Sequence, residues 1–399
     1  MRRLALAFLG LSLACAGARP GTVPVPPPVP PPALGVDLHA HFTMKRAARP
    51  IFRGEPGDGV VATSPGARLE NQLDAAQLRS AGVRLAFAAL WPPMDTLPDR
   101  TALDEALGQV AKLEAFAQGQ PGFAVVHSVL QARRALAEGR IALFPQIEGG
   151  EGIRAVEDVD RLFAAGVRCV VLAHLVDSDF AGAAKGQLAE NLLGIRPSGL
   201  EARGLSQVGK AAVERMIDLG ILVDLAHASD RTSADALEIA ARRNVPVIIS
   251  HTGARALFDM ERNTPDDLVR AVVKTGGLVG VTLSRDMVAT SEPFRLPAHQ
   301  PDTCDDVVAH WKHFASLVPP SSIALGSDFN GLIRRARPGG LCPHGLRHSG
   351  DLVELWAALE ASGVPRDALD GMGEKLLGVM AVVEEKASPD ARARALQPR

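Results

Sequence analysis

Six side chains that can bind a metal ion stand at the ends of apolar, β-branched segments of this sequence. They are His39, His41, Glu148, His227, His251 and Asp328. Imidazole and carboxylate ligands favour Zn²⁺, with Mn²⁺, Co²⁺ or Ni²⁺ as alternatives. One such histidine is weak evidence, because a core histidine bonded to a backbone carbonyl is the ordinary alternative. The full set argues against that alternative, and it predicts a fold that brings the ends of distant strands together.

Strands and helices alternate along the chain, which is how these side chains would be positioned. Strands are predicted over Val36–His41, Arg84–Leu90, Ile141–Glu148, Val167–His174, Ile221–His227, Pro246–His251, Leu278–Leu283 and Ile323–Asp328. Helices are predicted over Leu69–Ser80, Ala102–Ala117, Ala155–Ala165, Ser206–Leu219, Ser233–Arg243, Asp302–Leu317 and, at the end, within Leu352–Glu385. This alternation implies parallel strands, and eight repeats favour an α/β fold of the closed (β/α)8 TIM-barrel type over an open doubly wound sheet. Active sites of such barrels lie at the C-terminal ends of the strands, where the six side chains fall.

The chain begins with the features of an export signal, predicted over residues 1–18. Two arginines precede the apolar run Leu4–Ala14, which is too short to span a bilayer. One interpretation is a bacterial lipoprotein, with Cys15 acylated in an imperfect lipobox. The alternatives are cleavage after Ala18, giving a soluble secreted protein, and a retained anchor. We therefore expect the protein in the bacterial cell envelope, lipid-anchored or periplasmic or secreted.

A Pro-rich segment, residues 19–33, follows the signal and has the composition of a stiff polyproline II spacer. A tether is its natural use, and a leader without a role is the alternative. Residues 34–386 are predicted to be the catalytic barrel domain, and residues 387–399 a flexible tail. Cys304 and Cys342 flank the last predicted strand, and the sequence leaves their pairing open because geometry decides it.

The overall composition describes an ordinary globular enzyme. Hydrophobic residues make up 47% of the 399 residues, so a large core is available. The formal net charge is −2 and no basic stripe is present, which gives nucleic-acid binding no electrostatic support.

Several of these segments resemble the renal or membrane dipeptidase family of zinc peptidases, in the amidohydrolase superfamily. The most informative are Val36–His41, Gln146–Gly150, Val223–Ser229, Ser250–Ala256 and Gly326–Gly331. Their order and spacing are specific as a set, and the resemblance runs from about Val36 to Met380. It implies a metal-dependent dipeptidase that hydrolyses the peptide bond of dipeptides with a metal-bridging hydroxide. It also implies a homodimer as a frequent state, although no segment of this sequence shows such an interface.

The resemblance implies two zinc ions per chain. His39 and His41 would hold one ion, His227 and His251 the other, and Glu148 would bridge them. Other divalent metals remain alternatives to zinc.

The resemblance also implies roles in binding substrate and moving protons. Asp328, near the first metal, would be the acid and base, and His174 would face the scissile carbonyl. Arg262 would bind the carboxylate of the substrate. A structural ion pair of Arg262 with Asp266 or Asp267 is the alternative.

Two residues depart from the family pattern. His41 stands where the family usually has Asp, which removes one negative charge and implies a more electrophilic metal pair. Asn330 stands where the family commonly has a second Asp after Asp-Phe. His41 keeps a second hypothesis alive, in which a related amidohydrolase acts on another amide, a lactone or an ester. A third hypothesis is a metal-binding envelope lipoprotein that has lost catalysis, against which the presence of Asp328 and His174 argues. The sequence does not give the side-chain or stereochemical preference for the substrate.

Overall fold

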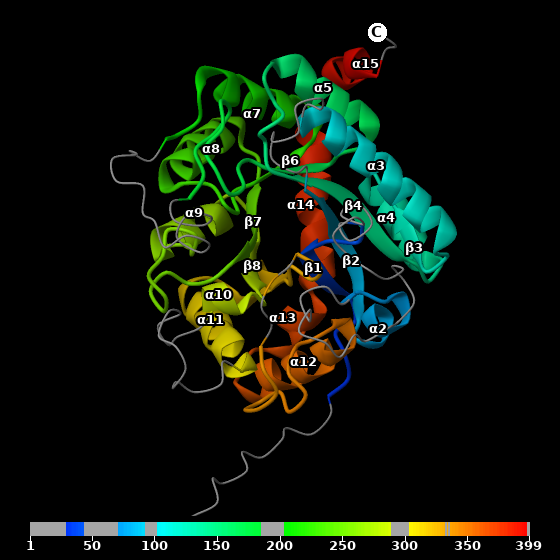
Figure 1. The fold of residues 1–399 in the computed structure, drawn as a ribbon, viewed down its shortest axis with the longest axis vertical. Coiled ribbons are helices and arrows are strands. Elements are labelled where there is room, and N and C mark those ends of the chain that lie inside the picture. The colour runs from blue at the N-terminus through cyan, green and yellow to red at the C-terminus, as the bar shows by residue number, and fades with distance from the viewer. Residues whose placement is uncertain are drawn as a thin grey trace, which may run out of the picture.

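A closed barrel of eight parallel strands forms the centre of the molecule, surrounded by helices (Figure 1). This computed structural model describes residues 29–43, 71–91, 102–184, 203–288, 303–331, 333 and 336–396. The hydrogen-bonded order is β2-β1-β9-β8-β7-β6-β5-β4, and pairing of β2 with β4 closes the ring. The fold is therefore the predicted (β/α)8 barrel.

The barrel contains one strand for each of the eight segments predicted from the sequence. Its strands are β1 (Gly35–Ala40), β2 (Val83–Leu90), β4 (Ile141–Glu148), β5 (Cys169–Val171), β6 (Leu222–Asp224), β7 (Val247–Thr252), β8 (Val279–Thr282) and β9 (Ile323–Gly326). A further strand that we did not predict, β3 (Phe123–Val125), adds to the outer edge of β4. The barrel strands are buried on both faces, which explains why they appear as continuous apolar runs.

Helices cover the outside of the barrel. In the first half they are α2 (Ala75–Ser80), α3 (Ala102–Gly119), α4 (Val129–Ala137) and α5 (Val156–Ala165). In the second half they are α7 (Gln207–Leu219), α8 (Asp230–Arg243), α9 (Asp266–Lys274), α10 (Arg285–Val288) and α11 (Cys304–Leu317). The last helices are α12 (Leu352–Ala361), α13 (Arg366–Asp370), α14 (Met372–Lys386) and α15 (Pro389–Ala395), with short 3₁₀ turns at Pro320–Ser322 and Ser349–Asp351.

Local capping signals set several helix ends. Ser206 and Ser229 accept backbone N–H groups of the first turns of α7 and α8, and Gly220 ends α7 in a left-handed conformation. The predicted helix Leu69–Ser80 was too long at its start. The helix begins only at Ala75, because Asp74 is extended and its side chain accepts the Gln77 N–H.

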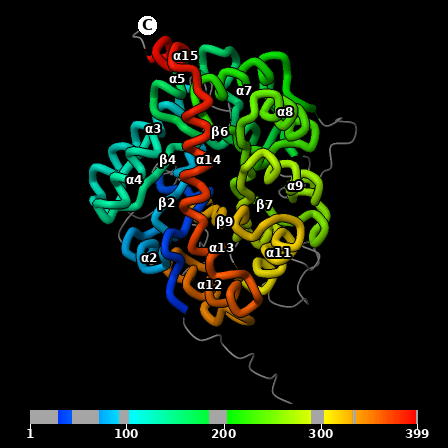
Figure 2. The backbone as a smooth tube through the Cα atoms, turned by 180° about the vertical axis from the view of Figure 1, so that it is seen from behind, coloured from blue at the N-terminus to red at the C-terminus, as the bar shows by residue number. Residues whose placement is uncertain are grey.

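The C-terminal end of the chain packs on the barrel, and the predicted flexible tail is wrong for residues 389–395. These residues form α15, which contacts α5 and α7. Ala391 and Ala395 are buried, and Arg392 lies over the Phe163 ring. We missed this helix because its buried face consists of small alanines, which give a weak hydrophobic period. Figure 2 shows α14 running across the back of the barrel, and α14 contacts β1, α4 and α7.

The described chain enters the barrel at the N-terminal end of β1. Arg366 on α13 donates to the carbonyl groups of Pro30 and Pro31, and Ala33 N–H bonds to Asp370. Residues 30–33, the described end of the predicted Pro-rich segment, therefore lie at the face opposite the C-terminal strand ends. The signal segment, residues 1–18, lies outside the described residues.

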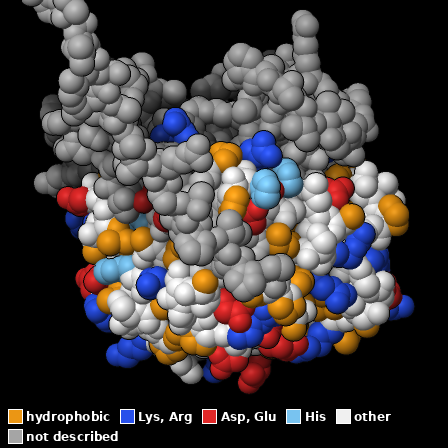
Figure 3. All heavy atoms as spheres, turned by 90° about the horizontal axis from the view of Figure 1, so that it is seen from below, with side chains coloured by type: hydrophobic (Ala, Val, Ile, Leu, Met, Phe, Trp, Pro, Cys, Tyr) orange, Lys and Arg blue, Asp and Glu red, His pale blue; other side chains and the backbone are white. Residues whose placement is uncertain are grey.

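Cys304 and Cys342 form a disulfide bond, which settles the pairing that the sequence left open. The bond ties the start of α11 to the segment after β9. Among the described residues, no helix combines the length and apolar character needed to cross a membrane. Figure 3 shows acidic and basic side chains intermixed on one face.

Candidate metal centre

The structure brings the six predicted ligand side chains to one end of the barrel. Glu148 is the last residue of β4, and His39 and His251 lie near the ends of β1 and β7. His41, His227 and Asp328 follow β1, β6 and β9. All are buried or nearly so, with side-chain exposures of 0% for His39, 4% for Glu148 and 14% for Asp328. Residues spread over about 290 positions of sequence thus converge on one buried site.

The Glu148 carboxylate is the centre of the cluster. Its Oε1 lies 3.2 Å from His39 Nε2, 3.3 Å from His227 Nε2 and 3.8 Å from His251 Nε2. Its Oε2 lies 3.4 Å from His41 Nε2. Oε1 thus faces histidines of both predicted halves and Oε2 faces His41, so the carboxylate lies where two ions could share it.

Asp328 lies on the side of His39 and His41. Its Oδ1 is 3.3 Å from His41 Nε2 and 3.9 Å from His39 Nε2, and it has no hydrogen-bond partner among the described residues. Asp328 N–H donates to the His39 carbonyl, so the backbone fixes the two residues together. Asp328 therefore lies beside His39 and His41, the two ligands predicted for the first ion.

Two residues of the cluster have left-handed backbone conformations. φ is 63° at His227 and 57° at Asp328, a region that costs a non-glycine residue about 1–3 kcal/mol. The His227 carbonyl accepts Ala184 N–H, which helps to hold this turn. In both cases the conformation turns a side chain from the strand end into the cluster, and such strain is typical of functional sites.

The donor atoms fit divalent metal ions. His227 Nε2 and His251 Nε2 are only 2.9 Å apart, and their lone pairs would repel each other unless a proton or a cation lay between them. His39 Nε2 is buried without a hydrogen-bond partner. Two ligand groups share Glu148: one contains His39 and His41, and the other contains His174 and His227. His174 thus lies close enough to belong to the second group, in addition to the predicted His251.

The protonation of the cluster follows from burial and from Glu148. Burial opposes the charged form of His39, but the Glu148 carboxylate outweighs it and raises the His39 pKa to about 9. Burial lowers the pKa of His174 to about 4 and that of His227 and His251 well below the ordinary value. These three rings therefore stay neutral at neutral pH, as a metal ligand must be.

Arg262 is buried beside the cluster, at 5% exposure. Its Nη1 donates to the His251 carbonyl at 3.0 Å, whereas Nε and Nη2 are buried with no partner among the described residues. Burial lowers its pKa to about 10, so it stays charged at neutral pH. The alternative ion pair with Asp266 or Asp267 is not formed: Asp266 bonds to His313, and Asp267 accepts the Leu268 N–H. The free donors can therefore bind an anion.

His174 follows β5 and lies at the edge of the cluster, with Nε2 3.6 Å from Glu148 Oε1. Its Nδ1 is buried without a partner, and its ring packs against Trp91 at a centroid distance of 5.4 Å. Glu151, which we did not predict, accepts the His174 backbone N–H at 3.0 Å. The backbone of His174 is thus held while one ring nitrogen remains available.

Asn330 explains one departure from the family pattern. Its Nδ2 donates to the His41 carbonyl and to Asn71 Oδ1, both at 3.0 Å, and its Oδ1 accepts Gln72 N–H. An aspartate could not donate either of the first two bonds. Asn330 therefore fixes the backbone of the unusual ligand His41, so the two departures touch each other.

Sequence reasoning missed Gln146 and Asp224, which lie beneath the cluster. Gln146 Oε1 is 2.7 Å from His39 Nδ1, and Gln146 Nε2 donates to Asp224. The signal was present, because a polar residue inside a buried apolar strand needs a partner. Gln146 also lies two residues before Glu148, on the same side of β4.

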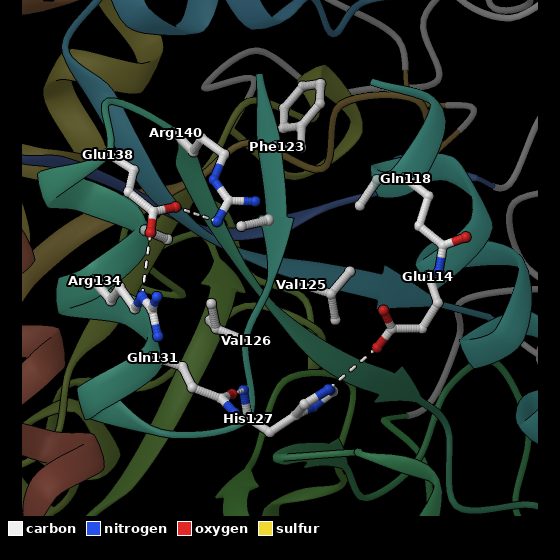
Figure 4. Close-up of a pocket in the computed structure, with 13 residues that line it drawn as sticks. Glu114, Gln118, Phe123, Val125, Val126, His127, Gln131, Arg134, Glu138 and Arg140 are labelled. Atoms are coloured by element: carbon white, nitrogen blue, oxygen red, sulfur yellow. Dashed lines mark hydrogen bonds and ion pairs between the residues drawn. The ribbon is translucent and has the colours of Figure 1, made fainter. Parts of the chain in front are cut away.

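A pocket of about 400 Å³ lies elsewhere in the described part of the chain (Figure 4). It is lined by residues of α3, β3 and α4, including Glu114 and His127, which form an ion pair. No ligand of the cluster lines it, so it is not part of the candidate site.

Comparison with known proteins agrees with the geometry. The model of the family described as membrane dipeptidase (peptidase family M19) matches residues 36–394. The chain belongs to this family. An uncharacterized dipeptidase of Schizosaccharomyces pombe is 34% identical over 195 residues, which are 49% of this chain and 42% of that protein.

Two solved structures share the fold. A family M19 metallopeptidase called dipeptidase AC is 22% identical with a TM-score of 0.69, covering 89% of this chain and 99% of that chain. A Rhodobacter sphaeroides metallopeptidase liganded with a phosphinate mimic of L-Ala-D-Ala is 19% identical with a TM-score of 0.69. The latter covers 88% of this chain and 99% of that chain. At these identities the likeness concerns the fold.

Proposed function

We propose that this protein is a metal-dependent dipeptidase that uses two divalent ions, with zinc as the first candidate. The observation that supports it most directly is the buried Arg262, whose two unpartnered donors lie beside a buried metal-ligand cluster. A charged group kept desolvated without a partner is costly, so an anionic ligand is the natural partner. A receptor for the C-terminal carboxylate this close to the metal ligands limits the substrate to a dipeptide.

The proposed ligands are those predicted, with Glu148 shared between two ions. When bound, divalent ions supply Lewis acidity, which polarises a carbonyl group and makes water a stronger acid. Arg262 would bind the substrate carboxylate through two charge-assisted hydrogen bonds and so orient the peptide bond.

Asp328 is proposed as the proton carrier. Its Oδ1 has no hydrogen-bond partner among the described residues and faces the cluster, so it can accept a proton from water and pass it to the leaving amine. His174, which is neutral because burial lowers its pKa to about 4, would donate a hydrogen bond from its ring to the developing oxyanion. The unpartnered ring nitrogen of His174 supports this role.

A panel of dipeptides tests the proposal. Protein loaded with Zn²⁺ should release free amino acids from L,L- or L,D-dipeptides, and a chelator should abolish the release. L-Ala-D-Ala is the first substrate to try, because a mimic of it was bound to the R. sphaeroides relative. If metal-replete protein cleaves no dipeptide but hydrolyses another amide, a lactone or an ester, the second hypothesis replaces the first. Binding of well under two ions per chain would contradict the binuclear site.

We further propose that the protein is exported and held at a membrane by a lipid on Cys15. The disulfide supports an oxidising compartment, where such bonds persist. Arg366 holds the Pro30 and Pro31 carbonyl groups by hydrogen bonds on the face opposite the metal centre. A tether attached there would leave the centre facing away from the anchor. Replacing Cys15 with Ala in a bacterial host should release the protein from the membrane fraction. An unchanged distribution would exclude the lipid anchor.

A further inference from the structure

A single buried carboxylate lies beneath both halves of the metal centre. Asp224 is the last residue of β6 and is fully buried. Its Oδ1 accepts the backbone N–H groups of Ala226 and Ser250 at 3.0 and 2.9 Å. Its Oδ2 accepts Gln146 Nε2 at 2.9 Å, and the Ser250 hydroxyl also hydrogen-bonds to this carboxylate. Asp224 itself lies below the ligands and is an acceptor only.

One connection from Asp224 reaches His39. Because Asp224 can only accept, the Gln146 amide must turn its NH₂ group toward Asp224 and its oxygen toward His39. That oxygen lies 2.7 Å from His39 Nδ1, which must therefore carry the hydrogen. In the neutral ring that a metal ion requires, the lone pair of His39 is then on Nε2, the atom that faces Glu148 at 3.2 Å.

The second connection reaches His251, a ligand of the other half. Ser250 Oγ lies 2.9 Å from His251 Nδ1. If the Ser250 hydroxyl donates its hydrogen to Asp224, its oxygen accepts from His251 Nδ1–H. The lone pair of His251 is then also on Nε2, facing His227. The rings of His39 and His251 stack at a centroid distance of 3.8 Å, so the two connections end side by side.

We propose that Asp224 is a positioning residue that fixes the ligand nitrogen of His39 through Gln146 and of His251 through Ser250. One carboxylate thereby fixes which ring nitrogen is free to bind a metal ion in one histidine of each half of the proposed binuclear centre. Groups that hold the second nitrogen of a metal-binding histidine usually change metal affinity by about 10- to 100-fold when they are removed. This inference rests on the metal site of the proposed function but not on its substrate.

The Asp224→Asn variant tests the proposal without changing the shape of the side chain. The asparagine NH₂ would face the Gln146 NH₂, and Gln146 would relieve the clash by turning its amide. Its NH₂ would then point at His39 Nδ1, and the His39 hydrogen would move to Nε2, where it blocks the metal. We expect Zn²⁺ affinity to fall about 10- to 100-fold, measured by competition with a chromogenic chelator.

A double variant distinguishes this mechanism from a general loss of structure. In Asp224→Asn with Gln146→Glu, the new carboxylate accepts from both the introduced asparagine and His39, and the total charge is that of the wild type. We expect Zn²⁺ affinity to return to within about 5-fold of wild type, although each single change weakens it. The visible spectrum of the Co²⁺-loaded double variant should also match that of the wild type.

Asp160→Asn is the matched control, because Asp160 is another buried carboxylate and pairs with Arg215 far from the centre. It should lower thermal stability without changing Zn²⁺ affinity. If Asp224→Asn does not fold, Ser250→Ala tests the other connection and should weaken Zn²⁺ binding about 10-fold.

Three results would overturn the inference: unchanged Zn²⁺ affinity in folded Asp224→Asn, a folded double variant no better than the single one, or unchanged affinity in Ser250→Ala. Absence of Zn²⁺ binding by the wild type would instead contradict the proposed function itself.

Discussion

Replacing Arg262 with Met should remove the recognition of the substrate carboxylate while leaving the fold and metal ligands in place. Met keeps most of the apolar volume of the side chain but has no charge and no N–H donor. Loss of a desolvated, charge-assisted pair costs about 2–5 kcal/mol, so kcat/KM for L-Ala-D-Ala should fall about 30- to 5,000-fold. The structure argues for the upper part of this range, because two donor atoms of Arg262 are buried and unpartnered.

The substrate-free protein should not lose much stability from this change. Only one hydrogen bond, from Arg262 Nη1 to the His251 carbonyl, is removed, and it contributes about 1 kcal/mol. Removal of a buried charge with unpartnered donors offsets that loss. Denaturant unfolding of the metal-loaded variant should therefore give a free energy within about 1 kcal/mol of wild type. A much larger loss would show that Arg262 is mainly structural.

A second substrate makes the assay specific. The C-terminal amide of L-Ala-D-Ala lacks the carboxylate, so wild-type protein should hydrolyse it much more slowly than the free dipeptide. Arg262→Met should hydrolyse both substrates at similar low rates. Arg255→Met is the control, because Arg255 and Arg262 both line a small pocket beside His227, but Arg255 is paired with Asp230 at 2.7 Å. Equal loss on both substrates in Arg262→Met would refute carboxylate recognition.

Four further changes probe the centre and its support. Asp328→Asn should abolish turnover while metal analysis still finds the wild-type metal content. His41→Asp, which adds a third carboxylate on the side of the cluster that holds Glu148 and Asp328, should destabilise metal-free protein by about 2–4 kcal/mol and enlarge the rise in melting temperature on adding Zn²⁺. Asn330→Asp loses its donation to the His41 carbonyl and should cost about 2–4 kcal/mol in denaturant unfolding. Cys304→Ser with Cys342→Ser opens a loop of 38 residues and should cost about 4 kcal/mol, measured in the same way against wild type with its disulfide intact.

The residues of the candidate metal centre could be predicted because strand position and chemical type both point to them. In a barrel of parallel strands, a histidine or carboxylate at a strand end lies at the catalytic face wherever it is in the sequence. His227 and Asp328 were found in this way, although neither lies within its strand as the structure bounds it. Their positive φ angles turn the side chains from beyond the strand ends into the cluster, and no sequence pattern predicted these backbone conformations.

The supporting residues could not be assigned from sequence in the same way, because their roles depend on which group donates and which group accepts each hydrogen bond. Gln146 is an ordinary buried amide until Asp224 and His39 are placed on either side of it. From the sequence, Asn330 could be identified only as a departure from the family pattern. Its role is given by the hydrogen bond that it donates to the His41 carbonyl. The α15 helix was missed for a related reason, since small buried alanines give little periodic signal.

The charge of the site connects its unusual ligand with its proposed substrate. With two divalent ions bound, the carboxylates of Glu148 and Asp328 and that of Asp224 beneath them would leave an excess of positive charge, to which buried Arg262 adds one more. The histidine at position 41 adds nothing to reduce it, whereas an aspartate there would. Excess positive charge in a buried site is costly unless anions enter, and both hydroxide and the carboxylate of a dipeptide are anions. On this argument His41 favours an anionic substrate over an uncharged ester or lactone, and the comparison of L-Ala-D-Ala with its C-terminal amide tests that preference.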